Sequence, residues 1–306
     1  MKAIIYRRYG GPEVLELADV PEPKLAQNSV LIRVKTAALN PADYVLQAGL
    51  GDSIMDTWFP VTPGWDVAGI VERVGVGVTE FAAEQEVIGF VREEILHHGT
   101  YAERISAPVS TLVRKPRNAT WAQAAGLPLA GLTAYQAIVH TLRLTKAETI
   151  LIHGASGGVG SLAAQIAVTR GARVIGSGSA TSYQYLRSIA VEPVLYGDGL
   201  VRDVRSIVPE GVDAILDRVG RGVLAFNRQL GGPELRICSI ADSAPGVTTV
   251  FARMEKADLL RLVELVETGE LTVPVADTYP LKDAAMAQSA LRKGGKGAGK
   301  IVLEMS

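Results

Sequence analysis

The chain has 306 residues, which is long enough for two domains of ordinary size. An apolar content of 48% and a charged content of 21% are typical of a globular protein, and no apolar run approaches the ~18 residues of a membrane span. A formal net charge of −1 provides no basic surface for nucleic acid, so neither nucleic acid nor membrane is an expected partner.

The first residues and the cysteine content bear on the cellular compartment. Residues 1–6 are typical of a strand. They are not expected to begin a signal peptide, because Arg7, Arg8 and Glu13 would interrupt its apolar core. Cys238 is the single cysteine, which excludes an internal disulfide and a thiolate-rich zinc site. We therefore expect a cytoplasmic protein.

The first 118 residues carry short strand-like runs separated by glycine and proline. This pattern predicts a barrel-like β domain. The expected strands are 2–6, 30–38, 67–74, 86–91 and 102–105. Residues 119–141 then become helical.

A strand, a glycine-rich turn and a helix follow in direct succession. Residues 149–153 are a β-branched apolar run, and helical spacing begins at Ser161 and ends near Gly171. Glycines in the turn let the backbone approach a diphosphate, which the first N–H groups of the helix would face. The spacing departs from strict G-x-G-x-x-G, but the strand–helix–strand context predicts a dinucleotide site. The turn consists of Gly154, Ala155, Ser156, Gly157, Gly158, Val159 and Gly160.

The remaining pattern favours a doubly wound α/β domain. Further strands are expected at 172–176, 212–217 and 235–240, and a helix at 257–267 packs on their sheet. Residues 271–275 are predicted as an edge strand, because Pro274 cannot donate to a ladder. A helix at 282–292 and a strand at 300–304 close the chain.

Six motifs occur in a fixed order along the whole chain. They are Asn40-Pro-Ala-Asp43, Pro63-Gly-Trp-Asp-Val-Ala-Gly69, Gly99-Thr-Tyr-Ala-Glu103, Gly131-Leu-Thr-Ala-Tyr135, His153-Gly-Ala-Ser-Gly-Gly-Val-Gly160 and Gly299-Lys-Ile-Val302. Together they resemble the zinc-independent medium-chain dehydrogenase/reductases, in particular the NADPH:quinone oxidoreductase branch. The resemblance implies a GroES-like β-barrel domain at 1–118, completed by 272–306, and a Rossmann NADP(H)-binding domain at 119–271. It also implies a homodimer, and a cofactor in the cleft between the domains.

The zinc-dependent members of that superfamily have a Cys and a Gly-His-Glu where this chain has Asn40 and Gly64-Trp65-Asp66. A catalytic zinc needs three protein ligands, so we predict no metal. His97 and His98 do not replace them. If they lie in a strand, their side chains point to opposite faces, and a solvated or packed role is favoured.

Residues 175–182 bear on the choice of nicotinamide cofactor. NAD selectivity usually relies on a carboxylate here, whereas this chain offers the hydroxyls of Ser177, Ser179 and Ser182, which predicts NADPH. By the resemblance, Tyr196 contacts the cofactor, and Thr181 stands where relatives have Lys or Arg. Arg187 is the nearest cation, or a solvated helix residue.

The resemblance adds four further residues to the cofactor site. They are Thr133 at the head of its helix, Val219, Ile240 and Lys300. For Lys300 the alternative is a solvated, glycine-rich hairpin at 292–300. Arg218 and Arg221, after the fourth strand, either reach phosphate or substrate or are surface charges.

The resemblance places Asn40 and Asp43 in the catalytic pocket beside the nicotinamide. Pro41 restricts Asn40 to extended conformations, so its amide could be held toward an acceptor oxygen; the alternative is that Asn40 and Asp43 are turn formers. Tyr44 is a candidate proton donor, or it covers the barrel core. The catalytic Tyr of related enoyl-thioester reductases is replaced by Gly51. A quinone tolerates that loss, because its reduced oxygens take protons from solvent.

Residues 49–60 carry apolar side chains that either cross the pocket mouth or pack on the domain. They are Leu50, Ile54, Met55, Trp58 and Phe59. The function favoured by the sequence is metal-free hydride transfer from NADPH to an apolar quinone or conjugated carbonyl. The alternatives are an enone C=C reductase, for example in a biosynthetic pathway, and a non-catalytic NADPH-binding protein.

Overall fold

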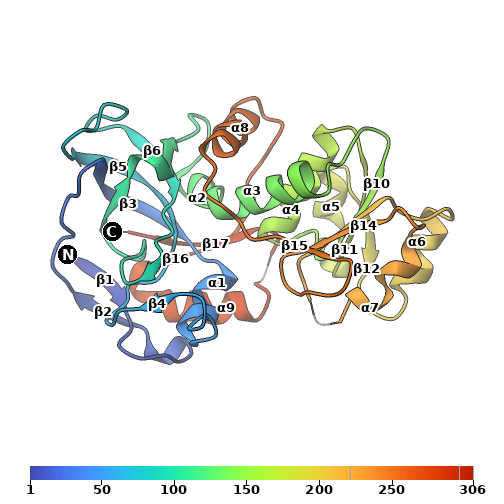
Figure 1. Cartoon of the computed structure of the whole chain (residues 1–306), viewed down its shortest axis with the longest axis horizontal. Coiled ribbons are helices and arrows are strands. Elements are labelled where there is room, and N and C mark those ends of the chain that lie inside the picture. The colour runs from blue at the N-terminus through green and yellow to red at the C-terminus, as the bar shows by residue number, and fades with distance from the viewer. Residues whose placement is uncertain (221, 296, 306) are drawn as a thin grey trace.

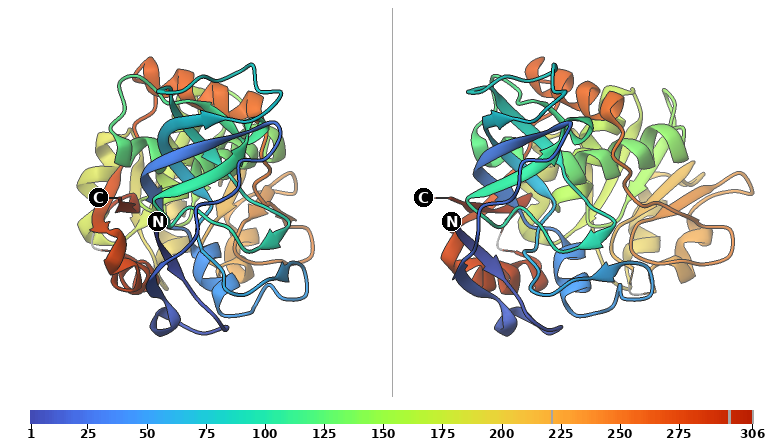
Figure 2. Two further views of the ribbon diagram at one scale, coloured as in Figure 1. Left: turned by 90° about the vertical axis from the view of Figure 1, so that its left-hand side faces the viewer. Right: turned by 60° about the vertical axis from the view of Figure 1, so that its left-hand side comes forward.

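The computed structural model describes residues 1–220, 222–295 and 297–305. Two lobes lie side by side along the long axis, one built mainly from the first 120 residues and one from the middle of the chain (Figure 1). The C-terminal elements return to the first lobe, so that both chain ends lie on it (Figure 2). None of the described helices combines the length and the apolar character that crossing a membrane requires.

The N-terminal lobe is built on a seven-stranded sheet in the order β16-β17-β3-β5-β6-β9, with β8 also paired to β3. These strands are β3 (Ser29–Ala38), β5 (Asp66–Val74), β6 (Glu86–Phe90), β8 (Arg104–Pro108), β9 (Leu112–Arg114), β16 (Val275–Pro280) and β17 (Lys300–Glu304). Strand β17 runs antiparallel to β3, with Val302 opposite Ala38. The last thirty residues therefore complete the sheet of this lobe.

The expected strand at 271–275 was wrong. Strand β16 begins only at Val275, because that residue pairs with Lys300, the first residue of its neighbour β17. The residues before it instead bury Leu271 and Val273 in the core. Strand β16 does lie at the sheet edge.

Shorter elements surround this sheet. They are β1 (Lys2–Ile5), η1 (Pro12–Val14), β2 (Glu16–Asp19), α1 (Pro41–Gln47), β4 (Asp56–Thr57), β7 (Ile95–Leu96), η2 (Val109–Thr111), η6 (Leu281–Asp283) and α9 (Ala284–Arg292). Helices α1 and α9 lie next to each other at the foot of the lobe (Figure 1).

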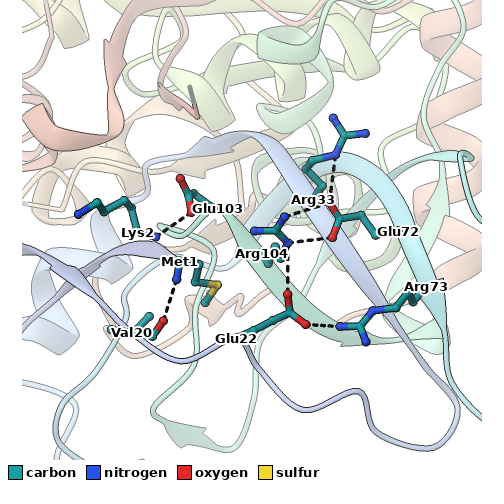
Figure 3. A network of polar contacts seen from close by, with 9 residues as sticks. All are labelled: Met1, Lys2, Val20, Glu22, Arg33, Glu72, Arg73, Glu103 and Arg104. Carbon is teal, nitrogen blue, oxygen red and sulfur yellow. Dashed lines mark hydrogen bonds and ion pairs between the residues drawn. The ribbon is translucent and has the colours of Figure 1, made fainter.

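A network of exposed ion pairs crosses the outer face of this lobe (Figure 3). Glu72 on β5 pairs with Arg33 at 3.2 Å and with Arg104 at 2.8 Å, and Arg104 reaches Glu22 at 3.5 Å. Exposed pairs of this kind contribute at most about 1 kcal/mol each. The network therefore fastens the segment around Glu22 to the sheet and does not shape the site.

The second lobe holds a six-stranded, fully parallel sheet in the order β12-β11-β10-β13-β14-β15. Counted from β10, this is the 3-2-1-4-5-6 order of the Rossmann fold. Its elements are α2 (Trp121–Ala125), α3 (Pro128–Tyr135), the π-helix η3 (Gln136–Thr141), β10 (Thr149–Ile152), α4 (Gly158–Thr169), β11 (Arg173–Gly178), η4 (Ala180–Ser182), α5 (Tyr183–Ser188), β12 (Glu192–Leu195), α6 (Leu200–Ile207), β13 (Ala214–Asp217), α7 (Leu224–Asn227), η5 (Arg228–Leu230), β14 (Arg236–Ser239), β15 (Thr248–Thr249) and α8 (Lys256–Glu267). The predicted fold class, a GroES-like β domain with a Rossmann sheet, is confirmed.

The predicted strand–turn–helix–strand unit is present as β10, α4 and β11. Helix α4 begins at Gly158, three residues before the expected Ser161, and Gly171 beyond its end has the positive φ of 79° expected of a C-terminal glycine. Gly157 forms a bridge to Gly299, just before β17. The glycine turn thus faces the N-terminal lobe, which sets the position of the site.

Candidate cofactor and active site

The glycine turn leaves the N-terminus of α4 without a cap. Gly157 is the N-cap residue, so the N-cap position has no side chain to accept from the first N–H groups of the helix. Gly154 has a φ of 66°, and a Cβ on Gly160 would lie 2.4 Å from the Gly154 carbonyl oxygen. The turn therefore closes only with glycine at these two positions, and its free N–H groups form a seat for an anion.

Two buried side chains support the turn from below. Ser177 Oγ, at the end of β11, accepts from Gly154 N at 3.1 Å, and Ala155 N donates to Ser177 O at 2.9 Å. His153 Nε2 lies 2.8 Å from Asn227 Oδ1, and burial lowers the pKa of His153. The Ser177 hydroxyl thus lies buried beneath the turn, where its oxygen accepts from Gly154 N and lies 3.4 Å from His153 Nδ1.

The ends of β13 and β14 are held by one buried carboxylate. Asp217 Oδ1 accepts from the backbone N–H groups of Val219 and Gly220, at 2.8 and 3.1 Å, and its Oδ2 accepts from Ser239 Oγ at 2.7 Å. Ile240 N donates to Asp217 O at 2.9 Å. These bonds place Val219 beside the glycine turn, where its Cγ2 would lie 3.0 Å from a Cβ on Gly154.

The end of β11 presents hydroxyl groups to solvent. Ser179 Oγ and the exposed Thr181 Oγ1 lie 2.8 Å apart. Tyr196, after the neighbouring strand β12, is 64% exposed, and Tyr196 N lies 3.4 Å from Gly178 O. Arg187 is also exposed and lies over the Tyr183 ring at 5.6 Å. This end of the sheet therefore offers neutral donors, and its nearest cation is occupied elsewhere.

The side chain of Lys300 extends from the start of β17, past the glycine turn, to the residues that follow β3 in the N-terminal lobe. Its methylene groups pass Gly158, where a Cβ would lie 2.7 Å from Lys300 Cδ, and Gly299 N donates to Ser156 O at 2.9 Å. Lys300 Nζ donates to Asn40 Oδ1 at 2.5 Å and to Leu39 O at 2.8 Å. Lys300 is only 5% exposed, so the alternative of a solvated hairpin does not hold for it.

Asp66 completes this buried network. Its Oδ2 accepts from Asn40 Nδ2 at 2.9 Å and lies 3.6 Å from Lys300 Nζ, while Oδ1 accepts from Leu129 N at 2.7 Å. Burial raises the pKa of Asp66 and lowers that of Lys300. The second amide hydrogen of Asn40 faces Ala38 O at 3.3 Å, so the amide is engaged within the protein and is not held toward a substrate oxygen.

Asp43 lies on the first turn of α1 with its carboxylate turned inward. Asp43 Oδ2 accepts from Asn40 N and from the buried Tyr101 hydroxyl, each at 2.7 Å. Burial raises the pKa of Asp43 to about 7, against the opposing effects of the Tyr101 and Asn40 hydrogen bonds and of Lys300. The carboxyl also lines a small cavity of about 10 Å³, together with Trp65, His98 and other residues of the lobe.

Of the next two predicted residues, only Thr133 lies differently from the expectation. Thr133 is in the second half of α3, not at its head, and its Oγ1 donates to Leu129 O at 2.7 Å. Tyr44 is half-buried, and the guanidinium of Arg292 lies 5.5 Å from its ring centre. Arg221 lies outside the described residues.

Comparison with known proteins agrees with this arrangement. The family model described as "Alcohol dehydrogenase GroES-like domain" matches residues 26–117, and that described as "Zinc-binding dehydrogenase" matches residues 190–303. An Arabidopsis thaliana NADPH-dependent alkenal/one oxidoreductase is 32% identical over 99% of this chain and 79% of its own length. A Sus scrofa quinone oxidoreductase is 31% identical over 99% of this chain and 97% of its own. The chain belongs to the medium-chain dehydrogenase/reductases, in the quinone oxidoreductase branch.

The solved structures agree with this assignment. One described as an NAD-dependent alcohol dehydrogenase superposes with a TM-score of 0.92 at 28% identity, covering all of both chains. This medium-chain reductase is accordingly an enzyme that acts on a small molecule with a nicotinamide cofactor. The uncapped helix and the glycine turn fit such a group, since they provide N–H donors for a diphosphate and no Cβ at the turn.

The histidine pair of this reductase differs from the expectation. His97 and His98 follow β7 and are not in a strand, and their ring centres lie 4.1 Å apart, so they share one side of the chain. Within the described ranges, no three His, Cys, Asp or Glu side chains gather to hold an ion. The prediction that the enzyme uses no metal stays a prediction, which elemental analysis of the purified protein tests.

Two residues of the network, Asp66 and Tyr101, have no role predicted from the sequence, although both lie within the six motifs. A carboxylate beginning an otherwise apolar strand was a usable signal, because a buried Asp needs a partner. The partner itself was beyond reach, since Lys300 lies 234 positions further along the chain.

The raised pKa of Asp43 leads to a prediction for stability. A carboxyl whose pKa is about 7 when folded and about 3.8 when unfolded binds its proton more tightly in the native state. We therefore expect the free energy of unfolding to fall by at most about 4 kcal/mol as the pH rises from about 4 to 7. Asp43→Asn should remove this fall. Urea unfolding of both proteins at pH 5 and pH 8 checks it, and an equal pH dependence would contradict it.

Proposed function

We propose that this enzyme transfers hydride from NADPH, without a metal, to a quinone or another apolar conjugated carbonyl. The observation that carries the proposal is the uncapped glycine turn beside a strand end with hydroxyls and no carboxylate. The names of the relatives, a quinone oxidoreductase and an NADPH-dependent alkenal/one oxidoreductase, support it.

The proposed cofactor-binding residues hold the dinucleotide along the carboxyl ends of the sheet. The turn from Gly154 to Gly160 receives the diphosphate, while Ser179 and Thr181 donate hydroxyls to the 2′-phosphate. When bound, the reduced nicotinamide supplies the hydride. The protein contributes position and the exclusion of water.

The N-terminal lobe carries the proposed catalytic residues and would form the wall of the substrate pocket. Asn40 and Asp43 are fixed by buried hydrogen bonds, so we propose that they shape the floor of the pocket, with Tyr44 above them as the candidate proton donor. A Cβ on Gly51 would lie 2.2 Å from Leu46 Cδ2, so a side chain at the position of the reductase tyrosine would have to displace the end of the Leu46 side chain. If Tyr44 does not donate, the proton for a reduced quinone would come from solvent.

Apolar side chains near this lobe suit an apolar substrate. Leu50 and Ile54 are each 75% exposed, and Trp58 is 59% exposed, whereas Met55 packs into the core. Met55 thus packs on the domain, whereas Leu50, Ile54 and Trp58 are exposed, as side chains at a pocket mouth would be. Exposed apolar side chains that gather in one segment are compatible with the proposed apolar substrate.

The second candidate function is reduction of an enone C=C bond, which the alkenal/one oxidoreductase relative favours. The two functions differ in the fate of the proton, because an alkene needs a proton on carbon and a quinone needs it on oxygen. A panel of quinones and enones with NADPH, followed at the nicotinamide absorbance band, separates them. Tight NADPH binding without oxidation by either class would contradict both.

The hydroxyls at the end of β11 lead to a prediction for cofactor preference. We expect kcat/KM for NADPH to exceed that for NADH, and Thr181→Asp to lower the NADPH value at least about ten-fold, because a carboxylate repels the 2′-phosphate. The value for NADH should change little. Thr181→Asn is the uncharged control. A wild-type preference for NADH, or an equal loss for both cofactors, would contradict the assignment.

We also propose the domain division 1–118 with 272–306 and 119–271, which the pairing of β17 with β3 supports. A homodimer formed through the Rossmann sheets is proposed in addition. Strand β15 lies at one edge of that sheet with both residues exposed. Sedimentation of the purified protein tests it, and a monomer at all concentrations would contradict it.

A further inference from the structure

Arg218 follows β13 and lies directly over the glycine turn. A Cβ on Gly157 would be 2.5 Å from Arg218 Nη1 and 2.7 Å from both Cζ and Nη2. A Cβ on Gly154 would be 2.9 Å from Arg218 Nε. The guanidinium therefore packs flat against the two glycines, on the face that a diphosphate would approach.

This is an unfavourable place for a cation. The guanidinium lies at the N-terminal end of α4, where the helix dipole is positive and the N-cap glycine has no side chain to cap the N–H groups. Arg218 Nε is buried and, among the residues that the structure describes, has no hydrogen-bond partner. A buried donor without a partner costs free energy, so the arrangement lacks an acceptor.

The neighbouring carboxylate does not provide one. Asp217 uses Oδ1 for the N–H groups of Val219 and Gly220, and Oδ2 for the Ser239 hydroxyl. Burial lowers the pKa of Arg218, although the charge of Asp217 opposes this. The Arg218 guanidinium, with its unpartnered Nε–H, and the first N–H groups of α4 thus lie close together. An anion with several oxygens could accept from both.

We infer that Arg218 binds the diphosphate of the dinucleotide cofactor. In the free protein its guanidinium rests on Gly154 and Gly157, which is where the diphosphate would lie. On binding, the guanidinium moves outward and pairs with the phosphate oxygens from the solvent side, while the N-terminus of α4 donates from the protein side. This inference rests on the proposed function, because it assumes a bound dinucleotide.

The same geometry allows an opposite effect, in which Arg218 only obstructs the seat. The two differ in sign. A ligand of the diphosphate strengthens cofactor binding, so its removal weakens binding; an obstruction competes with the cofactor, so its removal tightens binding. A planar guanidinium can form two parallel bonds to phosphate, and Lys cannot reproduce them.

The experiment is calorimetric titration of NADP⁺ and NAD⁺ into the wild type, Arg218→Met and Arg218→Lys at one ionic strength. Arg173→Met is the control, since Arg173 begins β11 at the opposite end of the sheet and pairs on the surface with Glu192. We expect Arg218→Met to weaken both cofactors about 10- to 100-fold by a common factor, Arg218→Lys to lie between, and the control to be unchanged.

A second readout separates binding from folding. Because Arg218 has an unpartnered buried donor, the melting temperature of cofactor-free Arg218→Met should equal or exceed that of the wild type. Unchanged or tighter binding would overturn the inference, and so would a loss confined to NADP⁺, which would place Arg218 at the 2′-phosphate. If the wild type binds neither nucleotide, both the inference and the proposed function fail. If the wild type binds but the variants do not change binding as expected, only the inference fails and the proposed function stands.

Discussion

Replacing Lys300 by Met should destabilise the enzyme by about 3–5 kcal/mol, the cost of breaking a buried pair by removing one partner. The substitution leaves Asn40 Oδ1 and Leu39 O without their donor and Asp66 without a nearby cation, all in the interior. The methionine side chain would still pass Gly158, so little packing is lost. Urea unfolding of both proteins at neutral pH gives the difference.

A matched control and a double substitution make this result specific. Lys115 is almost as buried, with 7% of its side chain exposed, but its partner Glu86 is half exposed, so Lys115→Met should cost clearly less. Asp66→Asn combined with Lys300→Met should cost less than the two single changes together, because the charge left unpaired is gone. Equal losses for the two lysines would contradict the account of a buried network joining the lobes.

Replacing Gly157 by Ala should weaken NADPH binding about 10- to 100-fold while the protein remains folded. The new methyl group would project toward the face where the diphosphate lies, and the nearest atoms there belong to the flexible Arg218 side chain. Gly157 has ordinary backbone angles, with φ −79° and ψ 178°, so alanine fits without strain and the loss at this N-cap position is at most about 1 kcal/mol. Fluorescence titration with NADPH and a thermal melt measure the two effects.

Gly160→Ala provides the contrast. Its Cβ would meet the Gly154 carbonyl oxygen at 2.4 Å and Ala155 Cα at 2.9 Å, and backbone atoms cannot move aside as a side chain can. We expect this variant to lose about 1–3 kcal/mol of stability as well as cofactor binding. If Gly157→Ala loses as much stability as Gly160→Ala, then Gly157 serves the fold and not the cofactor.

The parts of the fold that depend on residues close together in the sequence could be predicted from it. The run from β10 through the turn into α4 and β11 carries its own signals: β-branched residues, glycines and helical spacing. The helical stretch 119–141 was predicted as one piece, but Pro128 at the start of α3 divides it, and a π-helix follows from Gln136.

The contacts within the site could not be predicted in this way, because they join distant residues. Whether Lys300 is solvated or buried depends on Asp66, Asn40 and the space beside Gly158, none of which is near it in the sequence. The wrong start of β16 has the same cause, since its pairing partner is β17. The two alternatives for Arg218, a surface charge or a contact to phosphate, could not be separated from the sequence, because its place over the glycine turn depends on distant residues.

We expect a nicotinamide dinucleotide to lie across the glycine turn and to reach Asn40 and Tyr44. A crystal structure of the complex with NADPH tests it most directly. We predict the diphosphate on the N-terminus of α4, Arg218 lifted from Gly157, and the nicotinamide against the wall formed by Asn40 and Tyr44. A nucleotide bound elsewhere, or a guanidinium still resting on Gly157 with the cofactor present, would contradict this account.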